Sequence, residues 1–361
     1  MFTSDRQFYP IPQEGTVQIE TVGKPNGIGN ILFSKDLTHG INWFLGVLPI
    51  MRQYKRIQKQ IKNEFDIFVF FPCRYFQSPP LMRYVTAPIV YLPMEPPRYV
   101  YESFARYGRQ EQHKTAKGMM KEIKKKVLGK IDQKNVSYAT ELIAISRYTQ
   151  KYLQHIYNQD VSLCHFGVDP SEFFPMPGIV KERLVLSVGS LQPVKGHDFV
   201  LRSLAKMKID KKPKMVIICN SIDVTEKKFL EELSSKLRIE LCILFMVSHE
   251  ELRLWYNRAW VIACGQVGEP FGLVVLEALA CGTPVVAVNE GGFPDIVSSM
   301  MGGLLAERDE QKFADVLSFF FESESITKEW GMRGREIVSK EWTWEKSCKN
   351  LEIILDRITR K

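Results

Sequence analysis

Short apolar runs alternate with amphipathic stretches along the first half of the chain. The runs are rich in Val, Ile, Leu and Phe, and they predict strands at residues 17–22, 67–71, 89–92, 142–145 and 161–166. Between them, apolar positions recur with the period of a helix, most clearly over residues 48–61 and 119–131. Strands that alternate with helices are typical of an α/β fold with a mostly parallel sheet.

The pattern is interrupted in the middle of the chain and then begins again. Proline and glycine recur between Gly167 and Gly178, and both residues disfavour regular structure. Beyond this break, a helix is predicted from His197, and strands are predicted at residues 184–188, 215–218, 242–245, 261–263 and 285–288. We therefore expect two Rossmann-like α/β domains that face each other across a cleft.

The expected domain boundaries follow from this break. The first domain covers residues 1–168, a linker covers residues 169–181, and the second domain covers residues 182–340. The amphipathic stretch over residues 341–361 is predicted to be a helix that can cross back onto the first domain. A chain of 361 residues is longer than one hydrophobic core usually organises, which agrees with two domains.

Composition excludes several classes of protein and site. The seven cysteines are odd in number and lie in apolar runs, as small core residues of a reducing compartment do. Neither a Cys-x-x-Cys nor an Asp-x-Asp pair occurs, so we expect chemistry without a metal ion or covalent cofactor. No signal peptide opens the chain, and no apolar run reaches the roughly 20 residues that span a bilayer, so we expect a cytoplasmic protein.

The stretch over residues 269–297 has the pattern richest in chemistry. Glu269 and Glu277 are eight positions apart, and Gly272 between them opens an apolar run that reads as a helix. Gly291 and Gly292 form a loop after the next strand. A helix N-terminus attracts anions, and glycine lets an anion approach the backbone, so the pattern predicts a site for a phosphate-bearing ligand. The structural alternative is a surface or capping pair of glutamates.

This stretch and several others resemble family 4 glycosyltransferases of the GT-B fold. The likeness rests mainly on the E-x7-E signature from Glu269 to Glu277, followed by CGTPVV and GGFPDIV. It extends over most of the chain through the segments SVGSLQPVKG, ISRYTQKYL, HFGVD and MEPPR. The resemblance implies transfer of a hexose, with retention of configuration, from GDP-mannose or a UDP-hexose to a glycan, lipid-linked or polyol acceptor.

The resemblance also implies roles for single residues of the second domain, where the donor would bind. Glu269 would contact hydroxyls of the donor sugar, and Glu277 would contact the ribose of the nucleotide. Backbone groups of Phe271, Gly272 and Leu273 would hold the diphosphate. A carboxylate accepts two hydroxyl hydrogen bonds at once, which suits the role given to Glu269.

The first loop of the second domain supplies the expected cation. It contains Gly189, Ser190, Lys195 and Gly196, and Lys195 is expected to neutralise the diphosphate leaving group. The structural alternative is an ordinary solvated loop lysine. The pair Gly291 and Gly292 is interpreted either as a plain turn or as a contact for the donor.

Three departures from the family pattern motivate a second hypothesis. Ser190 stands where the family usually has arginine, and Met94 stands where many relatives have histidine, which leaves Glu95 and Arg98 as polar candidates on the acceptor side of the cleft. The start of the chain lacks the opening strand and glycine-rich loop of relatives, so we expect a missing strand-helix unit of roughly 30 residues. The alternative is a degenerate GT-B protein that binds nucleotide without transfer.

Much of the net charge of +8 lies within residues 114–134. The periodicity places a set of apolar side chains near one helix face, comprising Met119, Met120, Ile123, Val127, Leu128 and Ile131. The simplest interpretation is a core-facing helix with solvated lysines. The second is docking on an anionic membrane, which suits a lipid-linked acceptor and a peripheral location on the cytoplasmic membrane face. No nucleic-acid-binding module accompanies the charge, so no nucleic acid partner is expected.

Overall fold

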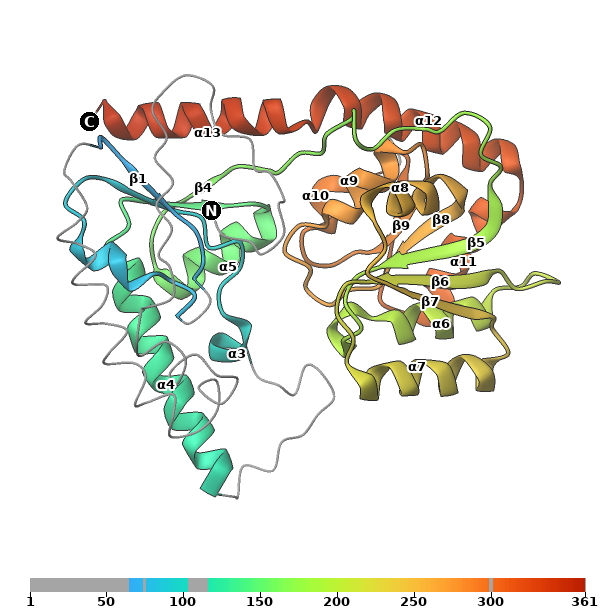
Figure 1. Cartoon of the computed structure of the whole chain (residues 1–361), viewed down its shortest axis with the longest axis horizontal. Coiled ribbons are helices and arrows are strands. Elements are labelled where there is room, and N and C mark those ends of the chain that lie inside the picture. The colour runs from blue at the N-terminus through green and yellow to red at the C-terminus, as the bar shows by residue number, and fades with distance from the viewer. Residues whose placement is uncertain (1–64, 74–75, 103–115, 299–300, 361) are drawn as a thin grey trace. The chain divides into compact units, whose positions relative to one another are not determined.

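The computed structural model describes residues 65–73, 76–102, 116–298 and 301–360, and their contacts divide into two compact units (Figure 1). Unit 1 contains the described residues up to Ile145, together with Thr149–Cys164 and the described residues from Cys348 onward. Unit 2 contains Ser146–Tyr148 and His165–Ser347.

Unit 1 is built on a parallel sheet. Its described strands run in the spatial order β1-β2-β3-β4, with bounds β1 (Phe68–Phe70), β2 (Ile89–Tyr91), β3 (Glu141–Ala144) and β4 (Val161–Leu163). Its helical elements are η2 (Pro80–Tyr84), α3 (Arg98–Tyr101), α4 (Ala116–Val136), most of α5 (Arg147–Tyr157) and the end of α13 (Trp344–Thr359). Parallel strands cannot be joined by a tight hairpin, so the longer connections carry these helices.

Both faces of the unit 1 sheet are buried. Leu142 of β3 packs in a cluster with Leu153 of α5, whereas the next residue, Ile143, packs with Ile354 of α13. Successive side chains of a strand point to opposite faces, so alternate apolar positions of β3 serve two cores. This explains why the strand reads as a continuous apolar run.

Helix α4 does not gather its apolar residues on one face. Leu128 is 3% exposed, whereas Met119 and Ile123 are 67% and 50% exposed. Lys126 and Lys130 are exposed as well, and spacings of three or four residues place all four exposed side chains on one side of the helix. The interpretation of a single core-facing apolar stripe is therefore wrong for Met119 and Ile123.

Unit 2 is built on a six-stranded parallel sheet in the order β10-β9-β8-β5-β6-β7. The strands are β5 (Glu182–Val188), β6 (Lys214–Cys219), β7 (Leu241–Phe245), β8 (Ala259–Cys264), β9 (Val285–Val288) and β10 (Gly303–Ala306). Numbered within the unit, this is the 3-2-1-4-5-6 order of dinucleotide-binding folds, with the first strand at the centre. Strands β8 and β9 are apolar and buried throughout because both faces of the sheet are covered.

Polar side chains start several helices of unit 2. Asp223 accepts hydrogen bonds from two N–H groups at the start of α7, and Ser248 and Glu251 form a capping box at the start of α8. The helices are α6 (His197–Lys206), α7 (Val224–Leu237), α8 (His249–Arg258), α9 (Leu273–Ala280), α10 (Phe293–Ile296), α11 (Glu310–Phe321), α12 (Glu324–Glu341) and the first residues of α13.

The sequence patterns located most of these elements. Within the described residues, each predicted strand matches one of β1 to β9 to within a few residues, and α6 begins at His197 as predicted. β4 ends at Leu163 rather than residue 166, because His165 and Phe166 pack in unit 2. The boundary between the two units thus falls between Cys164 and His165, before the linker expected at residues 169–181. The strand predicted at residues 17–22 and the helix at 48–61 lie outside the described residues.

Candidate functional site

The strand order of unit 2 identifies where a ligand would bind. β5 lies next to β8, and the connection after β5 runs to β6 on one side whereas the connection after β8 runs to β9 on the other, so the two loops diverge. Open α/β sheets bind ligands at this point, beyond the carboxyl ends of the strands. Lys195 follows β5, and Glu269 follows β8. The two residues expected to act on the donor therefore come from the two loops that border this point.

An ion pair joins these two loops. Lys195 Nζ lies 2.8 Å from Glu269 Oε2, and the two side chains are 27% and 19% exposed. The Lys195 side chain passes close to Gly189, where a Cβ would lie 3.4 Å from Lys195 Cδ. The pair is thus partly open to solvent.

Backbone contacts between glycines bring the two loops together. Gly196, next to Lys195, has a left-handed conformation with φ of 63°, and a Cβ there would lie 2.0 Å from the carbonyl oxygen of Gly265. Gly265 is the first residue after β8. Only glycine at position 196 permits this approach, so the position of Lys195 relative to the β8 loop depends on it.

The loop after β9 supports Glu269 from the other side. The Gly292 N–H donates a 2.7 Å hydrogen bond to the Glu269 carbonyl oxygen. A Cβ on Gly291, which has φ of 62°, would lie 2.5 Å from the same oxygen. Close packing against the Glu269 loop therefore requires glycine at positions 291 and 292. Neither of the two sequence interpretations included this requirement.

His197 anchors the first loop from beneath. It is 0% exposed, its Nδ1 lies 3.0 Å from Ser187 Oγ, and its Nε2 lies 3.2 Å from the Ser190 carbonyl oxygen. A carbonyl only accepts, so Nε2 carries the proton and Nδ1 accepts from Ser187. Burial lowers the pKa of His197 to about 4. His197 is therefore a neutral support for Ser190, with both ring nitrogens engaged by the protein.

The segment expected to hold the diphosphate begins α9. Gly272 is the N-cap with φ of 105°, and no side chain caps the first N–H groups of the helix, which starts at Leu273. The side chain of Phe271 is 2% exposed and packs near the rings of His165, Phe166 and Trp342. Phe271 thus anchors the helix start in the core and leaves its backbone at the loop.

Glu277 lies one turn into α9 and is half-buried. The hydroxyl of the fully buried Tyr256 donates a 2.6 Å hydrogen bond to Glu277 Oε2. Burial raises the pKa of Glu277, and the hydrogen bond from Tyr256 opposes that shift. Tyr256 therefore fixes the direction of the carboxyl group. The family resemblance did not identify this residue.

Arg308 is a second residue that the sequence did not reveal. It follows β10, and its guanidinium Nε lies 3.0 Å and 2.9 Å from the two carboxylate oxygens of Glu290. Its terminal nitrogens donate to the carbonyls of Gly265 at 2.9 Å and Gln266 at 2.8 Å. A polar residue just beyond a parallel strand indicates a candidate site residue, but β10 itself was not predicted from the sequence.

Asp295, in the predicted GGFPDIV segment, joins further parts of unit 2. Its Oδ2 lies 3.1 Å from His165 Nε2 and accepts a 2.6 Å hydrogen bond from the Arg147 backbone N–H. Burial acts to raise the pKa of Asp295, but these hydrogen bonds outweigh it and lower the pKa below its ordinary value. Ser146 Oγ donates to the Pro270 carbonyl at 2.6 Å, which fixes the residue beside Glu269.

The acceptor-side candidates belong to unit 1 and lie together. Arg98 Nε lies 2.7 Å from Glu95 Oε2, and Arg98 is the first residue of α3. Met94 before them has a positive φ of 60°, which is unusual for a side chain of that size. The structure brings Glu95 and Arg98 to each other.

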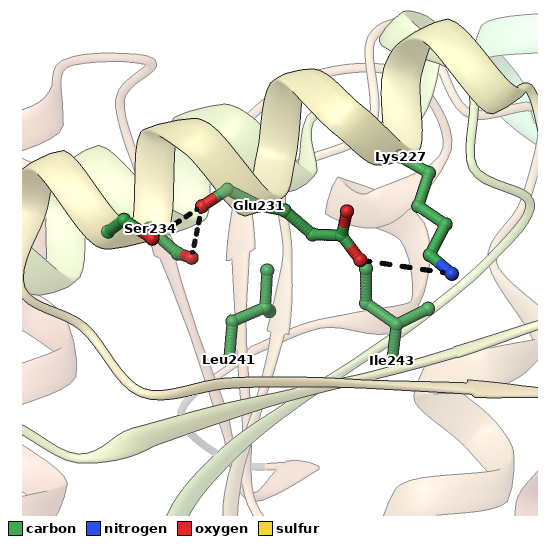
Figure 2. A pocket seen from close by; sticks show the side chains of 6 residues that line it. Lys227, Glu231, Ser234, Leu241 and Ile243 are labelled. Atoms are coloured by element: carbon green, nitrogen blue, oxygen red, sulfur yellow. Dashed lines mark hydrogen bonds and ion pairs between the residues drawn. The ribbon is translucent and has the colours of Figure 1, made fainter.

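A pocket of about 310 Å³ lies elsewhere in unit 2, between α7 and the edge strand β7 (Figure 2). Its lining residues are Lys227, Glu231, Ser234, Ser235, Leu241 and Ile243. The two serine hydroxyls donate to the Glu231 carbonyl, so their donors are already used by the helix. Lys227 and Glu231 form an ion pair of 3.8 Å there, between side chains one helical turn apart on α7. The candidate functional site remains the one at the strand ends, where the residues named by the resemblance lie.

The described part of the chain contains no group of three or more His, Cys, Asp or Glu residues arranged to hold a metal ion. None of its helices is both long enough and apolar enough to cross a bilayer.

Known proteins resemble this chain over its second half. Residues 171–337 match the family described as glycosyl transferases group 1. The D-inositol 3-phosphate glycosyltransferase of Corynebacterium jeikeium is 32% identical over 187 residues, which cover 49% of this chain and 44% of that protein. The protein of the same name from Streptosporangium roseum is 31% identical over 54% of this chain and 49% of its own length. The chain spans less than half the length of these curated relatives.

Solved structures resemble most of the chain. Sucrose-phosphate synthase from Thermosynechococcus elongatus has a TM-score of 0.68 at 17% identity, covering 87% of this chain and 78% of that one. HepE of Anabaena, in complex with UDP and glucose, has a TM-score of 0.66 at 16% identity, covering 87% of this chain and 83% of its own. The predicted α/β fold of Rossmann-like domains is confirmed. The chain thus has the fold seen in these solved structures, and residues 171–337 match the glycosyl transferases group 1 family.

Proposed function

We propose that this protein is a retaining hexosyltransferase that uses a nucleoside diphosphate sugar. The observation that carries the proposal is the ion pair between Lys195 and Glu269, 2.8 Å apart and partly exposed at the switch point of the unit 2 sheet. A cation and a carboxylate at this point match the two ends of the donor, because the diphosphate is anionic and the sugar carries hydroxyl donors.

Donor binding would separate the ion pair. The diphosphate competes with Glu269 for Lys195 and also meets the N-terminus of α9, whose first N–H groups no side chain caps. Glu269 is then free to accept hydrogen bonds from sugar hydroxyls. Glu277, directed by Tyr256, accepts from the ribose hydroxyls. Each residue keeps the role that the family resemblance implies for it.

We propose the reaction step that the resemblance implies. The bond from the anomeric carbon to the diphosphate oxygen breaks while a bond to the acceptor hydroxyl oxygen forms on the same face of the sugar. The departing phosphate oxygen takes the acceptor proton, so no side-chain nucleophile is required. Lys195 and the α9 N-terminus stabilise the negative charge that develops on the leaving group, and we propose that this charge replaces a metal ion.

The relatives indicate which substrates to try first. HepE is solved with UDP-glucose, and two relatives are named for D-inositol 3-phosphate. We propose UDP-glucose and GDP-mannose as donor probes, with glycan, lipid-linked and polyol acceptors that include D-inositol 3-phosphate.

The test combines binding and turnover on the same protein. A donor that binds only the native state stabilises it by mass action, by about 2.7 kcal/mol when its concentration is 100 times its Kd. The melting temperature rises as a result. We expect UDP-glucose or GDP-mannose both to raise the melting temperature and to be hydrolysed or transferred. Stabilisation without turnover of any donor, under every acceptor tried, would instead establish the alternative of a nucleotide-binding protein.

We further propose a peripheral position on the cytoplasmic face of an anionic membrane. The exposed side of α4 carries Met119 and Ile123 beside Lys126 and Lys130, so apolar and cationic groups share one surface. Met119→Ser with Ile123→Ser should reduce co-sedimentation with phosphatidylglycerol vesicles. Met332→Ser, which removes an apolar residue that is 59% exposed in unit 2, should not. Equal sedimentation with neutral phosphatidylcholine vesicles would contradict the proposal.

A further inference from the structure

Three loops at the strand ends of unit 2 meet at one guanidinium group. Arg308 follows β10, Glu290 follows β9, and Gly265 and Gln266 follow β8. We call the contacts of Arg308 with these three residues the Arg308 clasp. Four hydrogen bonds of 2.8 to 3.0 Å form it, two to Glu290 and one to each carbonyl. The side chain therefore reaches from the loop of the edge strand to the loop that leads to Glu269.

The clasp also contacts the first helix of the unit. The Arg308 guanidinium carbon lies 5.3 Å from the centre of the Phe199 ring, and Phe199 lies on α6, which follows the Lys195 loop. Cation–π contacts of this length are attractive. Arg308 thus touches the elements that follow β5, β8, β9 and β10.

The two carbonyls held by Arg308 are next to the proposed donor site. The Gly265 carbonyl oxygen is the atom against which Gly196 packs, and Gly196 adjoins Lys195. Gln266 is buried, 4% exposed, and lies three residues before Glu269. A movement of this backbone would therefore change the separation of Lys195 and Glu269.

The chemistry of arginine suits this position. Its planar guanidinium has five N–H donors in a fixed fork, which allows it to bind a carboxylate and two carbonyls at once. Glu290 pairs with Arg308 and neutralises its charge, so the guanidinium adds no net positive charge to these loops. Lysine carries the same charge as a single point and cannot reproduce the fork.

We infer that Arg308 is a positioning residue that sets the geometry of Lys195 and Glu269 by fixing the loop after β8. This inference rests on the proposed function for its kinetic consequence, but the structural consequence does not depend on any activity. Arg308 itself is not assigned a contact with the donor.

The first experiment needs no substrate. Amide hydrogen exchange of the full chain is compared for wild type, Arg308→Ala and Arg333→Ala. Arg333 is a matched control, because it also pairs with a glutamate, Glu329, and lies 5.5 Å from an aromatic ring, that of Trp330. We expect faster exchange in the peptides over residues 189–197 and 265–272 in the Arg308 variant only. Unchanged exchange in both peptides would overturn the inference.

The second experiment measures turnover of UDP-glucose and GDP-mannose. In Arg308→Ala we expect kcat to fall by about tenfold or more, as misplaced catalytic groups do, with KM for the donor changed less than about threefold. The kcat of Arg308→Lys should fall nearly as far. The kcat of Glu290→Gln should fall less, because the glutamine side chain keeps one oxygen that accepts a hydrogen bond. Full kcat in Arg308→Lys, or a loss in Arg308→Ala no larger than in Arg333→Ala, would contradict a positioning role.

The two experiments separate two kinds of failure. If wild type turns over neither donor, while exchange still rises in the Arg308 variant, the clasp stands and the proposed function fails. If wild type is active and the Arg308 variant matches Arg333→Ala in both exchange and kcat, the proposed function stands and the clasp fails.

Discussion

Asp132 of unit 1 and Glu269 of unit 2 are both carboxylates with close hydrogen-bond donors, but their surroundings differ. Asp132 is 1% exposed, and its Oδ2 accepts 2.7 Å hydrogen bonds from the hydroxyls of Tyr101 and Tyr157. Glu269 is partly exposed on a loop and pairs with Lys195. An acid enclosed by neutral hydroxyls holds the core together, whereas the proposed function requires an acid paired with a partly exposed lysine at a strand end to exchange that cation for a ligand.

The same contrast holds for charge. Burial raises the pKa of Asp132, and its hydrogen bonds from Tyr101 and Tyr157 oppose the shift. Its second oxygen, Oδ1, is buried and has no hydrogen-bond partner among the described residues. The uncompensated burial explains why this acid favours its neutral form more than an exposed one does.

The largest stability effect should come from removing the acceptor at Asp132. Asp132→Leu leaves the hydroxyls of two half-buried tyrosines without their partner, which should lower the free energy of unfolding by about 2–4 kcal/mol. Urea denaturation followed by circular dichroism measures this change. Donor turnover per folded molecule should stay at the wild-type value, and a parallel loss of turnover would place Asp132 in the site instead.

The pH dependence of stability should identify the same group. Because the folded pKa of Asp132 is raised, the folded state binds more protons, and the stabilisation present below the unfolded pKa, about 3.9, is lost as pH rises through the folded pKa. Asp132→Asn cannot ionise. The free energy of unfolding of this variant relative to wild type should therefore increase as pH rises from about 4, and a constant difference would contradict the raised pKa.

His197 should act with the opposite sign. Its folded pKa is lowered to about 4, so its stabilising contribution is present above the unfolded pKa and is lost as pH falls. As pH falls from 7 to 5, the free energy of unfolding should decrease by about 2 kcal/mol, because the histidine is protonated near pH 6.5 in the unfolded state but stays neutral in the folded state. His197→Asn should remove this dependence. An equally steep loss in that variant would assign it to other groups.

The smallest effect should come from Tyr256. Tyr256→Phe removes the hydrogen bond to Glu277 and should weaken UDP or GDP binding several-fold, corresponding to about 1 kcal/mol. Isothermal titration with each nucleotide measures this change. An unchanged Kd for the nucleotide that wild type binds would contradict a role of the Tyr256–Glu277 pair in binding the ribose.

The periodic patterns of apolar residues in the sequence predicted most of the strands and helices. Strand β9 has the predicted bounds of residues 285–288 because its apolar run is flanked by proline and glycine signals. Strand β10, Gly303–Ala306, has only four residues and begins with glycine, so its pattern is too short to distinguish it from a loop. The sheet order, which brings Lys195 to Glu269, depends on long-range pairing that no local pattern contains.

The candidate site was predictable where its residues form a motif. Glu269, Gly272 and Glu277 lie in one segment, and the resemblance named them together with Lys195. Arg308 was not predictable, because its partners Gly265 and Glu290 become neighbours only when β10, β9 and β8 lie side by side. Asp132 was missed for a related reason: it lies in a lysine-rich helix, and its tyrosine partners are 31 and 25 residues away.

The central claim is that Glu269 serves the donor and not the fold. The most direct test is the turnover of whichever of UDP-glucose and GDP-mannose wild type consumes, measured for Glu269→Ala. We predict a fall of about 100-fold or more, with the free energy of unfolding changed by less than about 1 kcal/mol because a partly exposed ion pair contributes little stability. Wild-type turnover in the folded variant would contradict the account.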